Sequence, residues 1–296
     1  RDLHLSIRRK RQMCIRDWDS AASYIYSNSD VNQLLYANNG ASFQSRWYQP
    51  FNTYTTGEFP LWDFRFSQDG TKIYLTFQSN TANSDPNEIQ RFDLSTPFDL
   101  STASSSAVQT LTTPTTGHSS ARFAISPDGK TGAFIKSNVD IVYYTTFSTA
   151  FDLTTAGSWN QWTASIVQND GPADIFYKPD GTKLYIMSDR ASYQGRVLQY
   201  DIPVSDLSAY ALQTDLPDLS VKQDKLLTFN IAAASYTAAS QVSSQDAMPK
   251  AMTVNPAGTT LIMFGLQNDT LYEYSMSTAW DVSTLTYTNR SWSMNN

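Results

Sequence analysis

Charged residues recur at one position of a sequence unit that the chain repeats. Asp63, Arg122 and Asp174 each lie six residues before the acid of an Asp-Gly pair. In a fourth copy, which lacks that acid, the same position is Ala251, and Lys250 precedes it. Two carboxylates and one or two bases could bind a polar ligand together, or the carboxylates could share acid/base work on a glycoside. The alternative, which we favour, is a solvated rim of mutually compensating charges, because aligned loop positions often carry charge.

Other polar residues give weaker signals of chemistry. His118 lies in a hydroxyl-rich loop and could act as a general base, but it has no accompanying nucleophile motif. The stretch 168–171 offers oxygens to Ca²⁺ but lacks the acidic spacing of a calcium loop, so a simple turn is the better interpretation. With only Cys14 and two histidines in the chain, cysteine-rich and multi-histidine metal sites are excluded. We therefore expect no catalytic residue, no metal and no cofactor.

Aromatic residues are the second source of candidate ligand contacts. The chain has 7 Trp, 17 Tyr and 15 Phe, and several of them fall in or beside predicted loops: Trp47, Tyr48, Trp62, Trp159 and Trp162. Exposed rings stack on sugars, and a hydroxyl-rich surface complements sugar hydroxyls, so Trp47 and Trp62 are candidate glycan contacts. The alternative is that aromatic rings fill gaps in the core. Phe98, Phe151 and Trp280 recur once per unit, and we assign them to packing.

The repeated unit predicts two kinds of local structure. Residues 64–75, 123–135, 175–186 and 252–263 each read as strand, tight turn, strand, with alternating apolar residues on both sides of a Gly that takes positive φ. A second unit follows at 89–102, 141–155 and 271–284, and a degraded copy ends at Ser208. It predicts a third strand, a turn with an aromatic-Asp pair, and a hydroxyl-rich fourth strand.

The length of the repeat indicates how the units assemble. The turn glycines Gly70, Gly129, Gly181 and Gly258 are 59, 52 and 77 residues apart, which is room for four short strands and their loops. A repeating four-stranded antiparallel unit is typical of a β-propeller blade, since blades bury their faces against one another. We predict an all-β propeller over residues 18–296 with five blades, six or seven being the alternatives. Residues 24–54 and 226–242 are candidates for a degenerate blade.

Two motifs carry a resemblance to known repeats. The sequences at 126–130 (SPDGK) and 178–185 (KPDGTKLY) resemble TolB-type and YVTN-type propeller repeats. Paired with the segment 277–284 (STAWDVST), they are similar to tandem repeats of uncharacterised marine bacterial and viral proteins. The resemblance covers about 62–296 and implies the propeller fold alone, since such folds host many functions. Gly129 directly follows Asp128, unlike the spaced Asp-box of sialidases, and Trp280-Asp281 precedes a Ser-Thr strand, unlike a WD repeat.

The charge of the chain is unevenly distributed. Residues 1–17 carry a net charge of +4 against −6 for the whole chain, and residues 11–17 resemble translated library-adaptor sequence. We interpret 1–17 as an artefact or a disordered tail, with a functional basic arm as the third possibility. The remainder is acidic, which argues against a nucleic-acid partner. Apolar runs are too short for a membrane span.

These observations favour a non-catalytic propeller that binds a protein or a glycan. Only 16% of residues are charged, whereas 36 Ser and 32 Thr supply polarity, and this surface suggests an extracellular, cell-envelope or virion location. One alternative is a propeller enzyme, such as a lactonase-like hydrolase, a lyase or a glycosidase, in which Asp63 and Asp174 would converge on one ligand. Another is an architectural part of a larger assembly, which would expose an apolar patch or an unpaired terminal blade.

Overall fold

The computed structural model describes residues 61–77, 86–116, 121–136, 139–162, 171–188, 195–206 and 227–294. They form four antiparallel sheets of four strands and one two-stranded sheet. Blade 1 contains β1 (Leu61–Phe66), β2 (Lys72–Phe77), β3 (Pro86–Asp93) and β4 (Gln109–Thr116); blade 2 contains β5 (Ala121–Ile125), β6 (Thr131–Lys136), β7 (Val139–Thr146) and β8 (Asn160–Trp162). Blade 3 contains β9 (Pro172–Tyr177), β10 (Lys183–Ser188), β11 (Arg196–Asp201) and β14 (Ser235–Gln241); blade 4 contains β15 (Pro249–Val254), β16 (Thr260–Gly265), β17 (Thr270–Met276) and β18 (Leu285–Ser293).

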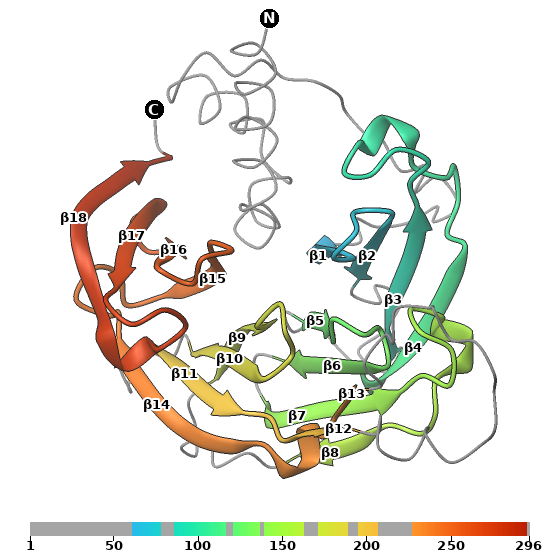
Figure 1. The fold of residues 1–296 in the computed structure, drawn as a ribbon. Coiled ribbons are helices and arrows are strands. Elements are labelled where there is room, and N and C mark those ends of the chain that lie inside the picture. Colours follow the sequence, from blue (N-terminus) through green and yellow to red (C-terminus); the bar gives the residue numbers. More distant parts are fainter. Residues whose placement is uncertain are drawn as a thin grey trace, which may run out of the picture.

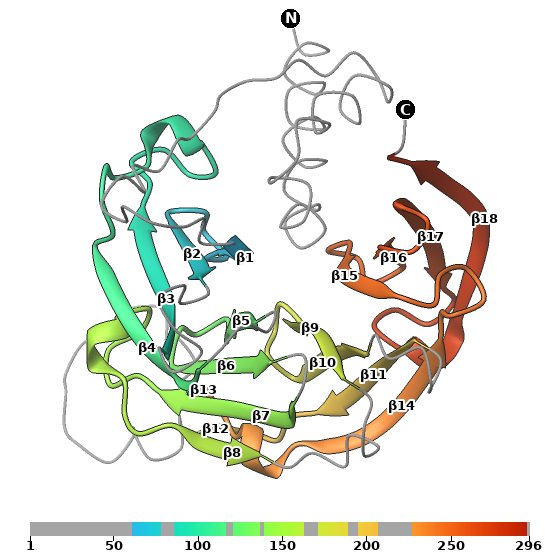
Figure 2. The same cartoon turned by 180° about the vertical axis from the view of Figure 1, so that it is seen from behind.

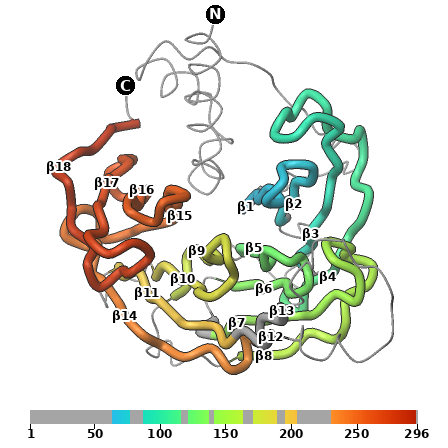
Figure 3. The backbone as a smooth tube through the Cα atoms, viewed as in Figure 1, coloured from blue at the N-terminus to red at the C-terminus, as the bar shows by residue number. Residues whose placement is uncertain are grey.

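The blades follow one another around an arc. Figures 1 and 2 show the first strand of each blade, β1, β5, β9 or β15, nearest the centre and the fourth strand, β4, β8, β14 or β18, at the outside. Blades 1 and 4 stand at the two ends of the arc, and the tube in Figure 3 follows the same course. The predicted propeller repeat is confirmed.

The predicted number of blades is wrong for the described residues, which form four blades rather than five or more. The long third step of the repeat holds a hairpin, β12 (Val204–Asp206) paired with β13 (Leu227–Phe229), inserted between the third and fourth strands of blade 3. Residues 226–242 therefore contain part of this hairpin and β14, not an extra blade. Residues 24–54 lie outside the described residues.

The tight turns follow the predicted geometry. The four turn glycines have φ between 69° and 74°, a left-handed conformation that glycine adopts without a steric penalty. In blade 1 the Gly70 N–H donates to the Ser67 carbonyl at 2.8 Å, and the Asp69 carboxylate accepts from the Thr71 N–H at 3.0 Å. The sequence thus closes each hairpin through a glycine and a side-chain acceptor, and it fixes the register of the first two strands.

The aromatic-Asp segment between the third and fourth strands forms a structure that we call the clasp: residues 98–102, 151–155 and 280–284. Its aromatic residue, Phe98, Phe151 or Trp280, has φ of 61–62° and donates its N–H to the carbonyl of the turn glycine at 2.8–2.9 Å. The following Asp caps a three-residue 3-10 helix: η1 (Leu100–Thr102), η2 (Leu153–Thr155) or η4 (Val282–Thr284). The clasp therefore joins the connection between the third and fourth strands to the tight turn between the first and second strands of the same blade.

Blade 3 departs from this pattern. Its 3-10 helix, η3 (Ile231–Ala233), follows Asn230, which makes no side-chain cap hydrogen bond. The degraded copy predicted at 197–208 is correct in its third strand, β11, but its turn is wrong, because Ser205 and Asp206 belong to β12 of the inserted hairpin. In the part of the chain that the structure describes, none of the helices is long and apolar enough to cross a membrane.

Apolar side chains gather between neighbouring blades. One buried cluster joins each adjacent pair, with Phe123 and Phe134 between blades 1 and 2, Ile175 and Leu198 between blades 2 and 3, and Met263 between blades 3 and 4. Burying this area is the main stabilising contribution to the fold. Two further clusters lie within blade 1 and within blade 4.

Candidate functional site

The inner strands bring three of the predicted site residues together with a fourth that was not predicted. Asp63 and Arg65 on β1, Arg122 on β5 and Asp174 on β9 form the axial cluster, with at most 9% of each residue exposed. This differs from the solvated rim that we expected. The first strand of each blade lies nearest the axis (Figure 1), so equivalent positions on three blades converge there.

The two acids of the axial cluster hold neighbouring blades together. Asp63 Oδ2 accepts from the Phe123 N–H on blade 2 at 3.4 Å. Asp174 repeats this contact at the junction of blades 3 and 4, where its Oδ2 accepts from the Met252 N–H at 2.8 Å. Its other oxygen accepts from the Ile175 N–H at 2.8 Å. Each carboxylate therefore joins its own inner strand to that of the next blade.

Arg65 connects the two acids. Its Nε lies 3.1 Å from Asp63 Oδ2, and its Nη2 donates to Asp174 Oδ1. The guanidinium thereby reaches from blade 1 to blade 3 across the inner end of blade 2. Arg122 donates its Nη1 to the Ala121 carbonyl at 3.1 Å. Two acids and two bases balance the charge of a buried site, which limits the cost of removing them from water.

The environment of Asp63 perturbs its ionisation. Burial raises the pKa of this carboxyl to about 6, and the nearby Asp174 carboxylate acts in the same direction. The charges of Arg65 and Arg122 and the hydrogen bond from Phe123 oppose the increase. A carboxyl with a pKa near 6 has the acidity of a general acid or base, but it also arises wherever a carboxyl is buried. Its complete burial favours the second explanation.

Blade 4 adds no charged side chain at the position equivalent to Asp63. Ala251, buried on β15, occupies the position equivalent to Asp63, and Lys250 precedes it and is partly buried. Trp62 belongs to β1. Trp47, His118 and residues 168–170 lie outside the described residues. The described residues contain no group of three or more His, Cys, Asp or Glu that could hold a metal ion.

The described loop aromatics pack rather than face solvent. Trp159 Nε1 donates to the Thr112 carbonyl at 2.9 Å, across the junction of blades 1 and 2. Trp162 is buried and meets the Tyr200 ring edge-on at 5.1 Å between blades 2 and 3. The packing role assigned to the clasp aromatics is also confirmed, since Trp280 stacks on Phe176 at 6.3 Å.

Two residues were missed by reasoning from the sequence. Arg65 lies two residues after Asp63, so the period of two along a strand places both side chains on one face. That signal was available. Tyr236 on β14 is 50% exposed and packs edge-on against Tyr200 at 5.8 Å. Its exposure follows from the position of β14 at the outside of blade 3, which the sequence does not indicate.

Comparison with known proteins gives similarity of fold only. No family model matches the chain, and no curated protein matches it. A 6-phosphogluconolactonase-type protein of Bacteroides fragilis is 14% identical over 86% of this chain and 59% of its own, with a TM-score of 0.47. The periplasmic gluconolactonase PpgL of Pseudomonas aeruginosa is 12% identical over 79% of this chain and 54% of its own, with a TM-score of 0.43.

A third similar structure is the β-propeller domain of Cps50 (Swd1) from Myceliophteria thermophila. It is 10% identical over 81% of this chain and 74% of its own, with a TM-score of 0.40. The chain spans 59% and 54% of the length of the two lactonase-type proteins. The assignment of the propeller fold rests on the strand order of the four blades.

Proposed function

We propose that the protein is a non-catalytic propeller module that binds a glycan through its outer surface. The observation that carries this proposal is the closure of the axial cluster. Asp63 and Asp174, the acids that the described inner strands place at the axis, have no exposed surface, and both contact the backbone of the next blade. These carboxylates hold neighbouring blades together and do not face a ligand. We therefore place ligand binding on the outer strands of the blades.

The outer strands supply the chemistry for a sugar ligand. On β14 Tyr236 is exposed, and so are its sequence neighbours Ser235 and Thr237, the second of which exchanges hydrogen bonds with Gln199 through its hydroxyl. An aromatic face stacks on the apolar face of a pyranose ring, while adjacent hydroxyls exchange hydrogen bonds with sugar hydroxyls. The uncharged polar composition supports the same ligand class, and with it an extracellular, cell-envelope or virion location.

The binding proposal is tested by probing the full chain on a glycan array. We expect specific glycans to be retained, and the Tyr236→Ala variant to lose at least tenfold in affinity for them. Val108→Ala is the matched control, because Val108 is 48% exposed and precedes an outer strand of another blade. Trp47→Ala and Trp62→Ala test the sites predicted from the sequence. Affinity unchanged in Tyr236→Ala, or binding only to protein ligands, contradicts a glycan site on β14.

The raised pKa of Asp63 favours one alternative, a propeller enzyme that uses this carboxyl as an acid. The two proposals differ in what Asp63→Asn does. An enzyme would lose turnover of lactone or glycoside substrates by a factor of 100 or more in this variant. A binding module shows no turnover of these substrates above background and keeps its glycan affinity in Asp63→Asn. Turnover abolished by this substitution would therefore overturn the non-catalytic proposal.

A further inference from the structure

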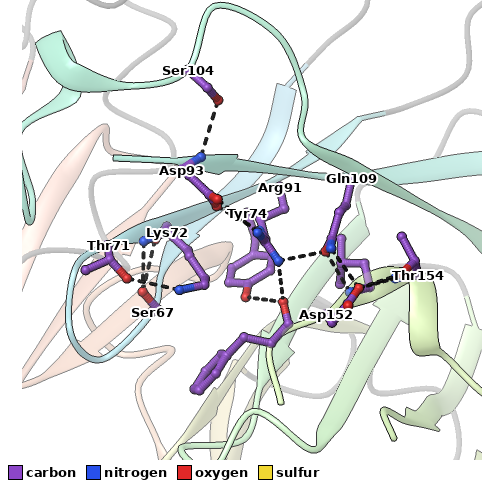
Figure 4. Close-up of polar contacts among 12 residues, drawn as sticks. Ser67, Thr71, Lys72, Tyr74, Arg91, Asp93, Ser104, Gln109, Asp152 and Thr154 are labelled. Atoms are coloured by element: carbon purple, nitrogen blue, oxygen red, sulfur yellow. Dashed lines mark hydrogen bonds and ion pairs between the residues drawn. The ribbon is translucent and has the colours of Figure 1, made fainter. Parts of the chain in front are cut away.

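Polar side chains of one blade hold the clasp of the next. In blade 1 a cross-strand row begins four residues after the turn glycine and contains Tyr74, Arg91 and Gln109. Arg91 Nη1 donates to the Phe151 carbonyl of blade 2 at 2.9 Å, and Gln109 Nε2 donates to the Asp152 carboxylate at 2.7 Å. Figure 4 shows Arg91, Gln109 and Asp152 converging. We call this row the holding row.

The amide that follows the clasp Asp is also held. In blade 2 the Leu153 N–H donates to Gln109 Oε1 at 2.9 Å. The junction of blades 3 and 4 repeats this arrangement, since the Val282 N–H donates to Gln199 Oε1 at 3.0 Å and Tyr185 donates its hydroxyl to the Trp280 carbonyl at 2.8 Å. Tyr185 and Gln199 occupy the same row of blade 3. A clasp and a holding row therefore form a recurrent interface.

Blade 1 carries a clasp at the end of the arc. In the held clasps, the residue after the Asp is buried: Leu153 is 1% exposed and Val282 is 0% exposed. Leu100, its equivalent in blade 1, is only partly buried, and the Asp99 carboxylate accepts hydrogen bonds from the N–H and the hydroxyl of Ser101 in the same clasp. The apolar cluster within blade 1 includes Leu100 and Phe66 on this side. This end of the arc has the composition of a blade interface.

Blade 4 carries a holding row at the other end. Its row, again starting four residues after the turn glycine, contains Ile262, Glu273 and Arg290. Arg290 Nη1 lies 3.2 Å from Glu273 Oε1, and 69% of the Arg290 side chain is exposed. The apolar cluster within blade 4 adds Ile262, Trp292 and Met294, all partly buried. Arg290 occupies the position of Gln109 in the row and supplies donors there. Glu273 occupies the position of Gln199 and supplies an acceptor there.

We propose that two copies of this chain associate head to tail, with the holding row of blade 4 in one copy receiving the clasp of blade 1 in the other. The contact repeats the internal interface: Arg290 donates to the Asp99 carboxylate, and Glu273 accepts from the Leu100 N–H. The charges are complementary, and the apolar clusters at the two ends of the arc cover each other. Because the two surfaces differ, the contact is heterologous, and it leaves a free end on each copy unless it closes into a ring.

The test is the molar mass of the full chain by sedimentation over a hundredfold range of concentration. We expect mass to rise with concentration and the association to weaken with salt. Asp99→Arg and Arg290→Asp each place like charges in the contact, and each should raise the dissociation constant at least tenfold. The double variant restores opposite charges and should return it to within about threefold. Lys130→Asp, an exposed reversal in blade 2, is the control and should leave the mass unchanged.

Hydrogen exchange at the Leu100 amide separates the possible occupants of this surface. Protection that rises with protein concentration supports contact between copies. Protection that is the same at all concentrations means that the surface is covered within one chain, which overturns the proposal. A monomeric mass throughout the range overturns it as well, and so does a double variant that fails to recover while its circular dichroism and melting temperature match those of the wild type.

Discussion

Replacing Asp63 by asparagine should change how the stability of the protein depends on pH. The folded protein raises the pKa of this carboxyl from its ordinary value of 3.8 to about 6, mainly through burial. Between these values the folded state binds a proton that the unfolded state has released. The favourable contribution of the protonated group is complete below pH 4 and is lost as the pH rises through 6.

The expected magnitude follows from the shift. Each pKa unit corresponds to about 1.4 kcal/mol, so the free energy of unfolding should fall by about 3 kcal/mol between pH 4 and pH 7 because of this group alone. Asparagine does not titrate, and its side-chain oxygen can still accept from the Phe123 N–H. The free energy of unfolding of Asp63→Asn, minus that of the wild type, should therefore rise by about 3 kcal/mol over the same interval.

Urea unfolding of both proteins at pH 4, 5, 6 and 7 measures this difference. Subtraction removes the other titrating groups, including Asp69 and Asp180, whose pKa values are lowered by hydrogen bonds despite their partial burial. Their contribution to the free energy of unfolding has the opposite pH dependence, since it is lost as the pH falls. A difference that stays flat from pH 4 to 7, or that falls, would refute our account of a buried Asp63 dominated by desolvation.

Two paired substitutions test the packing of the clasp and of a buried hydroxyl. Gly258→Ala should destabilise the protein by about 2–4 kcal/mol in thermal unfolding, because the new Cβ would lie 2.2 Å from the Trp280 ring at a φ of +72°. Gly157→Ala should change the stability by no more than about 0.5 kcal/mol in the same assay, because its Cβ would lie 3.6 Å from the nearest atom, the Thr146 carbonyl oxygen. Tyr185→Phe should lower the free energy of unfolding in urea by about 1 kcal/mol, because the Trp280 carbonyl loses its donor. Tyr177→Phe should leave it unchanged or raise it, because the Tyr177 hydroxyl is buried without a hydrogen-bond partner. Equal effects within either pair would contradict the corresponding contact.

The sequence predicts the hairpins well because their determinants are local. A glycine with positive φ and a neighbouring Asp fix each turn, and alternating apolar residues fix the faces of the strands around it. The clasp was recognised as a repeated turn for the same reason. Its role between blades was not predicted, because Gln109 and Asp152 are 43 residues apart and meet only when the blades pack.

The errors in blade 3 have a physical cause. The long spacing before Gly258 predicts room for another blade, but an inserted hairpin occupies it. Such insertions are tolerated because lengthening a loop adds little to the entropic cost of closing it. Ser205 and Asp206 resemble the clasp sequence and predict the turn there, whereas the helix η3 forms after Asn230 and begins at Ile231. Burial of Ile231 maintains the turn there without a capping acid.

The junction of blades 2 and 3 shows what the clasp contributes and what it does not. Blade 3 has no clasp sequence, and the holding row of blade 2 begins with Ala133 in place of tyrosine. This junction is nevertheless packed, with Trp162 edge-on against Tyr200 and Ile231 buried in the same apolar cluster. An apolar cluster therefore packs these two blades together where no clasp is present.

The polar contacts must then have a different role at the other junctions. A hydrophobic surface accepts any partner of suitable shape, whereas a row of donors and acceptors fits only the matching clasp. Clasps and holding rows thus specify which faces meet and in which register, while apolar burial stabilises the contact once it is made. The same division explains why the ends of the arc, which combine an apolar cluster with complementary charges, should select each other rather than any exposed sheet.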